Sequence, residues 1–131
     1  MDFNDEKDYI MRIIKEVSRV LFSLMLGKQY KSVELQKENK YEVSGETLEE
    51  LQNMVDQGLV NEAENVLLEG IDYTKEQEII AAVLFYQYVS EKDTEFLTLH
   101  SYSKEEALDG LKRLTEKSGY GELSHIFPEF G

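Results

Sequence analysis

The sequence predicts an all-α protein in which helical hairpins surround one buried central helix. The central helix is indicated by the stretch IIAAVLFYQYV at residues 79–89, where Gln87 alone is neither apolar nor aromatic. A helix that is apolar on every side is normally covered by the rest of its domain. Four capping-box patterns each precede an apolar periodic run. No segment shows a convincing strand-type alternation of apolar and polar residues.

The composition is typical of one globular domain, expected to span residues 1–131. The chain contains no cysteine, so disulfides and cysteine-ligated metals are excluded. A formal net charge of -13 repels phosphate backbones and anionic lipid surfaces, so we expect neither a nucleic-acid nor a membrane partner. The acidic N-terminus is unlike a signal peptide, and a cytoplasmic location is expected.

The first helix is expected from about Asn4 to Leu26. One apolar stripe predicts its core face: Ile10, Ile13, Ile14, Val17, Leu21, Leu24 and Met25. Phe22 and Leu26 lie off that stripe, and apolar groups on a polar helix face often mark an interface. These two residues are therefore candidates for self-association, unless the lysine-rich, partly helical connector predicted at residues 27–43 covers them.

The capping boxes predict where the remaining helices begin. In each box the first side chain accepts a bond from a backbone N–H one turn on, and the acid or amide reaches back to the cap. The boxes are Thr47-x-x-Glu50, Asn61-x-x-Glu64, Thr74-x-x-Gln77 and Ser103-x-x-Glu106. The helices that follow are expected at residues 48–57, 62–69, 75–90 and 104–117, the first two as an antiparallel pair. Residues 91–102 are expected to form a connector, and the tail is expected to dock Ile126, Phe127 and Phe130 on the core.

Residues 58–70 resemble the second half of a tetratricopeptide repeat. In that family a small residue at the turn precedes an alanine, then a large apolar residue, then another small residue. Gly58, Ala63, Leu67 and Gly70 occupy those places here, whereas bulky Leu51 departs from the pattern in the preceding helix. The resemblance implies tetratricopeptide-like packing over about a third of the chain rather than a repeat array.

The opening EKDYIMRIIKEVSRVLFSLMLGK resembles the start of a family of short bacterial proteins of unknown function. The residues that carry this resemblance precede a long amphipathic helix and are Lys7, Asp8, Tyr9, Ile10, Met11 and Arg12. The chain length also agrees with that family. The resemblance implies no activity.

No motif in the sequence predicts catalysis or a cofactor. Glu122 and His125 have the Glu-x-x-His spacing of di-iron bundles, but such a site needs a second copy of the motif. Leu97 stands three residues before His100, so the second copy is missing. Nucleophilic catalysis has no candidate either, since the chain has no cysteine and no Gly-x-Ser-x-Gly motif. We therefore expect no enzyme, no cofactor and no metal site.

Tyrosines near the central helix are the candidate lining of a groove or pocket: Tyr73, Tyr86, Tyr88 and Tyr102. A buried tyrosine needs a partner for its hydroxyl, which favours half-wet groove walls, although core rings with surface hydroxyls would give the same pattern. The expected role is a non-catalytic protein-interaction or scaffolding module of the bacterial cytoplasm, whose partner is another protein or a second copy. The alternative is a small-molecule-binding or regulatory helical domain with an aromatic pocket. An open groove would favour the first, and a closed apolar cavity the second.

Overall fold

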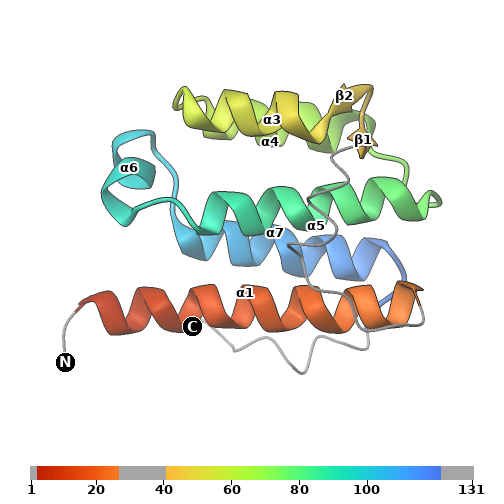
Figure 1. The fold of residues 1–131 in the computed structure, drawn as a ribbon, viewed down its shortest axis with the longest axis horizontal. Helices are drawn as coiled ribbons and strands as arrows, with labels where there is room; N and C mark the ends of the chain where they lie inside the picture. Colours follow the sequence, from red (N-terminus) through yellow and green to blue (C-terminus); the bar gives the residue numbers. More distant parts are fainter. Residues whose placement is uncertain (1–2, 27–40, 122–131) are drawn as a thin grey trace.

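The computed structural model describes residues 3–26 and 41–121, and these form an all-α fold (Figure 1). In chain order the elements are α1 (Phe3–Leu26), β1 (Glu42–Val43), β2 (Glu46–Thr47), α3 (Leu48–Asp56), α4 (Val60–Gly70), α5 (Glu76–Ser90), α6 (Thr94–Leu99) and α7 (Lys104–Lys117). None of the helices in this part of the chain combines the length and apolar character that a bilayer span requires. The predictions for residues 27–40 and for the tail, with Ile126, Phe127 and Phe130, lie outside the described residues.

Helix α5 is the centre of the fold, as its sequence predicts. Every residue from Ile79 to Gln87 is buried, and so are Val89 and Ser90. The helix contacts α1, α3, α7 and β1, and Figure 1 shows it between the α3–α4 pair and α1. Each face of α5 meets another element, which is why the helix needs no polar stripe.

Helix α1 has the predicted bounds to within one residue, but its core face is rotated from the predicted one. Its buried residues are Ile10, Ile14, Val17, Ser18, Leu21 and Phe22, with Ile13, Met25 and Leu26 partly buried. Ser18 can be buried because its hydroxyl donates a hydrogen bond to the Ile14 carbonyl oxygen at 2.7 Å. Leu24, predicted to face the core, is 54% exposed. The core face therefore runs through Ser18 and Phe22 instead of Leu24.

Phe22 and Leu26 consequently do not form the predicted exposed patch. The structure leaves no surface of Phe22 exposed, and it packs Leu26 partly against the core. A twofold contact through Phe22 would require this side chain to leave the core of its own chain. Of the two alternatives for Phe22, exposure at an interface or cover by its own chain, the structure shows the second.

A small hairpin precedes α3, although the sequence showed no strand pattern. Strands β1 and β2 pair in antiparallel fashion, with Val43 opposite Glu46. The two loop residues, Ser44 and Gly45, have φ angles of 57° and 79°, as in the type I′ turns that suit two-residue hairpins. The Ser44 N–H donates to the Glu78 carboxylate of α5 at 3.3 Å. Strands this short cannot show alternation, and contacts with α5 help to hold them.

Two of the four capping boxes are present in the structure, and two are wrong. The reciprocal bonds form at the starts of α3 and α7, between Thr47 and Glu50 and between Ser103 and Glu106. Helix α4 instead begins after Leu59, and α5 after Lys75, without a side-chain cap. The Asn61 amide donates to the Ser101 carbonyl oxygen at 3.1 Å, and the Thr74 hydroxyl donates to Asp72 at 2.6 Å. Other partners thus replace the predicted local bonds.

The predicted connector between α5 and α7 contains the short helix α6, which lies against the turn between α3 and α4. Leu97 anchors α6 in the core. The His100 ring, just after α6, covers Gly58, where an added Cβ would lie 2.3 Å from a ring carbon. Gly58 also has a φ of 90°, so the position suits only glycine. Helices α3 and α4 pack against each other across this turn.

Candidate functional site

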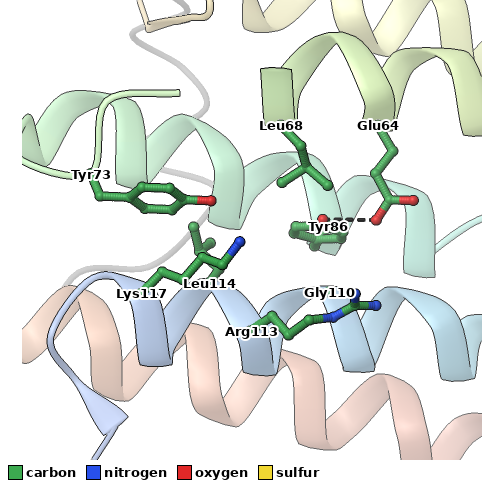
Figure 2. A pocket seen from close by; sticks show the side chains of 8 residues that line it. All are labelled: Glu64, Leu68, Tyr73, Tyr86, Gly110, Arg113, Leu114 and Lys117. Atoms are coloured by element: carbon green, nitrogen blue, oxygen red, sulfur yellow. Dashed lines mark hydrogen bonds between the residues drawn. The ribbon is translucent and has the colours of Figure 1, made fainter. Parts of the chain in front are cut away.

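A hollow opens on the surface between α4, α5 and α7, and we call it the α4/α7 hollow (Figure 2). Its volume is about 50 Å³. Its lining residues are Glu64 and Leu68 of α4, Tyr73 of the loop before α5, Tyr86 of α5, and Gly110, Arg113, Leu114 and Lys117 of α7. Figure 2 shows the α4 side chains facing those of α7 across the hollow.

Helical spacing places most of these residues on shared faces. On α7 the lining positions are separated by three, one and three residues, which is the spacing of one helix face. On α4 the two lining residues are one turn apart. Tyr73 is placed by the loop, because the Thr74 N–H donates to the Asp72 side chain at 2.9 Å and closes a tight local turn. The faces of α4 and α7, the turn that holds Tyr73, and Tyr86 of α5 therefore assemble the hollow.

The floor of the hollow is the ring of Tyr86, which lies directly on Gly110. An added Cβ at Gly110 would lie 2.4 Å from ring atom Cε1, far inside van der Waals contact. A glycine in a helix interior costs about 1 kcal/mol relative to alanine, and here the missing side chain makes room for the ring. The buried Tyr86 hydroxyl donates a hydrogen bond to Glu64 Oε2 at 2.8 Å.

The Glu64 carboxylate is the half-buried polar centre of the hollow. Burial raises its pKa, while the hydroxyls of Tyr86 and Tyr102 and the charge of Arg113 act in the opposite direction. Burial, together with the Glu64 charge, raises the pKa of Tyr86 and of Tyr102, so both phenols stay protonated. The Tyr102 hydroxyl lies near Glu64 but makes no hydrogen bond of good geometry. Of these two tyrosines, Tyr86 is therefore the one whose hydroxyl is hydrogen-bonded to Glu64.

Two cations stand at the rim of the hollow. Arg113 pairs with Asp109 one turn earlier on α7, and both side chains are more than half exposed. Such an exposed pair on one helix contributes only about 0.3–0.5 kcal/mol. The Lys117 ammonium lies 5.9 Å from the centre of the Tyr73 ring. Within residues 3–26 and 41–121, Lys117 makes no hydrogen bond or ion pair, so its charge is available at the rim.

The structure brings together two of the four candidate tyrosines. Tyr73 and Tyr86 line the α4/α7 hollow. Tyr88 points elsewhere, and its hydroxyl donates to Asp56 Oδ1 at 2.6 Å, where Lys92 also binds. Tyr102 is buried behind Glu64 and does not line the hollow. The tyrosines therefore do not form one common groove.

The hollow is open and small. Pockets for drug-sized ligands have volumes of roughly 300–1,000 Å³, several times the volume of this hollow, which is about 50 Å³. In the described part of the chain, no group of three or more histidine, aspartate or glutamate side chains is arranged to hold a metal ion. The His100 ring packs at a tilt against Phe96, with ring centres 4.7 Å apart, and His125 lies outside the described residues.

Sequence reasoning missed most of the lining. Leu68, Gly110, Arg113 and Lys117 were not singled out, although a glycine inside a helical pattern often has a packing reason. Gly110 could have been singled out from the sequence, because it stands in the middle of a strongly periodic helical pattern. The partner of that glycine, Tyr86, could not be identified without the packing of α7 on α5.

Comparison with known protein families matches residues 4–119 to a group described as a family of unknown function, DUF6483. Comparison with curated proteins and with solved structures finds no match. The family match agrees with the resemblance seen at Lys7 to Arg12.

Proposed function

The chain belongs to this family of unknown function, whose match covers residues 4–119, and we propose that it serves as a non-catalytic protein-interaction or scaffolding module of the bacterial cytoplasm. The observation that supports this proposal is the α4/α7 hollow. It is small, it is lined by apolar, aromatic and charged side chains, and its rim carries Leu68, which is 43% exposed.

The size of the hollow favours a protein partner over a small molecule. A volume of about 50 Å³ admits the end of one side chain but not a whole metabolite-sized ligand. Protein interfaces are commonly organised around one anchoring side chain in such a pocket, with tyrosine and arginine enriched around it. Tyr73 and Arg113 supply those residue types here. The partner is another protein or a second copy of this chain.

Small-molecule binding in an aromatic pocket is the second candidate function. It is favoured by the two tyrosines that line the hollow, Tyr73 and Tyr86. Tyr86, however, is fully buried under its neighbours, and its hydroxyl is already bonded to Glu64. A small ligand would therefore meet mainly Tyr73, and native mass spectrometry of the purified protein would reveal a retained ligand.

Tetratricopeptide-like packing of the α3–α4 pair remains a proposal. Ala63 and Leu67 are buried, as that packing requires. Gly58 and Gly70 lie against residues outside the α3–α4 pair, since an added Cβ would meet His100 at Gly58 and Ser44 at Gly70. We therefore base the proposed interaction on the α4/α7 hollow and not on a repeat surface.

Site-specific photocrosslinking tests the proposal. Tyr73 is replaced by p-benzoylphenylalanine in cells that make the protein, and Tyr9, which is 49% exposed on α1, receives the same replacement as a matched control. We expect one discrete protein adduct from position 73, none of the same mass from position 9, and loss of the adduct when Leu68→Asp is added. The same adducts from both positions, or an adduct indifferent to Leu68→Asp, would contradict the proposal.

A further inference from the structure

The charges around the α4/α7 hollow differ in sign from the protein as a whole. The chain has a formal net charge of -13, yet the hollow is lined by two cations, Arg113 and Lys117, and by one carboxylate, Glu64. The two cations are one turn apart on α7, so they stand on the same side of the opening. Asp109 already pairs with Arg113, so Lys117 is the lining cation that has no acidic partner among the described residues. Its charge attracts a negatively charged group at this point of an otherwise strongly acidic surface.

The carboxylate in the lining does not cancel this attraction. Glu64 is turned onto the Tyr86 hydroxyl at 2.8 Å and is half-buried beside the ring (Figure 2). Burial also raises the pKa of Glu64, which disfavours its charged form. Among the residues that the structure describes, Arg113 forms its ion pair with Asp109, and that pair is exposed. A guanidinium has five N–H donors. A second carboxylate can therefore bind Arg113 without displacing Asp109.

The rest of the lining is apolar. Leu68 lies on the side of the hollow opposite α7, Tyr73 lies beside Lys117, and the buried side chain of Leu114 also lines the hollow. An apolar side chain placed here would cover Leu68, whose exposure is 43%. The Lys117 ammonium lies 5.9 Å from the Tyr73 ring centre. A charged group next to that apolar side chain would therefore be within reach of Lys117.

We propose that the α4/α7 hollow recognises a protein segment in which an apolar side chain is directly followed by a carboxylate. The apolar side chain occupies the hollow beside Leu68 and Tyr73, and the carboxylate binds Arg113 and Lys117. The carboxylate is the free one at the end of the partner chain, on the same residue as the apolar side chain. This inference rests on the proposed interaction function and specifies its partner.

A pair of small probes tests the inference on the full chain. N-acetyl-L-leucine carries the apolar side chain beside a carboxylate, and N-acetyl-L-leucinamide is identical except that the charge is missing. Methyl NMR spectra of the protein are recorded during titration with each probe at millimolar concentration. We expect the Leu68 and Leu114 methyl signals to shift and those of Leu24 on α1 to stay. Since hydrogen bonds to charged groups are the stronger ones, the acid should bind about tenfold more tightly than the amide.

Matched lysine variants test whether Lys117 binds the carboxylate. Lys117→Gln should weaken binding of the acid severalfold and leave the amide unchanged. Lys15→Gln removes the same charge from an exposed position on α1 and should change neither. Equal binding of both probes, no shift with either probe, or equal effects of the two lysine variants would overturn the inference. Such results would leave the crosslink from position 73 intact, so failure of the inference is distinguishable from failure of the proposed function.

Discussion

The contact between Gly110 and Tyr86 gives the sharpest stability prediction. In Gly110→Ala the new methyl group would lie 2.4–2.7 Å from three atoms of the Tyr86 phenol. Contact at normal distance needs about 3.5–4.0 Å between carbon atoms, so the whole ring must move by roughly 1 Å. The ring has no exposed surface, and it is packed edge-on against Phe85 with ring centres 5.5 Å apart. It cannot move without disturbing the core.

The expected magnitude follows from three contributions. Alanine favours the helix by about 1 kcal/mol over glycine. Overpacking a core costs about 1–3 kcal/mol, and loss of a hydrogen bond to a charged group costs about 1.5–3 kcal/mol. The net change is a loss of about 1.5–5 kcal/mol in the free energy of unfolding. Urea unfolding, followed by far-ultraviolet circular dichroism, measures it.

A double-mutant cycle decides whether the ring is the cause. In Tyr86→Leu the phenol is absent, so adding Gly110→Ala should be neutral or should stabilise the protein by up to about 1 kcal/mol. If Gly110→Ala costs the same in both backgrounds, the steric argument is refuted. If it stabilises the wild-type protein, Tyr86 can shift freely, and the floor of the hollow is not fixed by Gly110.

Three further predictions test the core, the polar cluster and the helix caps. Phe22→Ala should lower the free energy of unfolding by about 3–5 kcal/mol, whereas Leu24→Ala should change it by less than about 0.5 kcal/mol; the reverse order in urea unfolding would restore the core face predicted from sequence. Because burial raises the pKa of Glu64 in the folded state, the folded protein holds this proton to higher pH than the unfolded chain does. The stabilisation by the neutral carboxyl is therefore complete below the ordinary value of 4.5 and is lost as the pH rises through the folded pKa. The difference in unfolding free energy between the wild type and Glu64→Gln should fall across that range, and a flat difference would contradict the assignment. Thr47→Ala and Ser103→Ala should each cost about 1 kcal/mol, measured by thermal unfolding, and no loss would mean that these boxes do not hold their helices.

Local signals in the sequence were sufficient for five of the six described helices, all except α6. The all-apolar stretch at residues 79–89 identified the central helix, because only a helix covered on every side tolerates such a pattern. The Ser103 box and the periodic residues after it predicted α7 with the bounds that the structure shows. Both signals depend on neighbours within one or two turns, so they are complete in the sequence.

The same local patterns failed where a distant group competed for the side chain. Asn61 matched the cap pattern as well as Ser103 did, but its amide bonds to the Ser101 carbonyl. Phe22 and Leu24 are equally apolar, yet the folded structure buries Phe22 and leaves Leu24 exposed. Helix α6 depends on Leu97 reaching the core and on Ser101 taking a φ of 60°. Periodicity predicts that a face exists, but not which face a neighbour covers.

The candidate site was decided almost entirely by the tertiary structure. Its tyrosines were recognisable as residues that need a hydroxyl partner, and Tyr86 does find one in Glu64. Glu64 itself is one of 27 acidic residues, and nothing in its local sequence distinguishes it from a solvated one. It becomes a polar centre because α4 lies over α5 and places it above a ring that rests on Gly110. Burial, and therefore the pKa and the available charge, depends on every element packed around a group, and the sequence near that group does not contain this information.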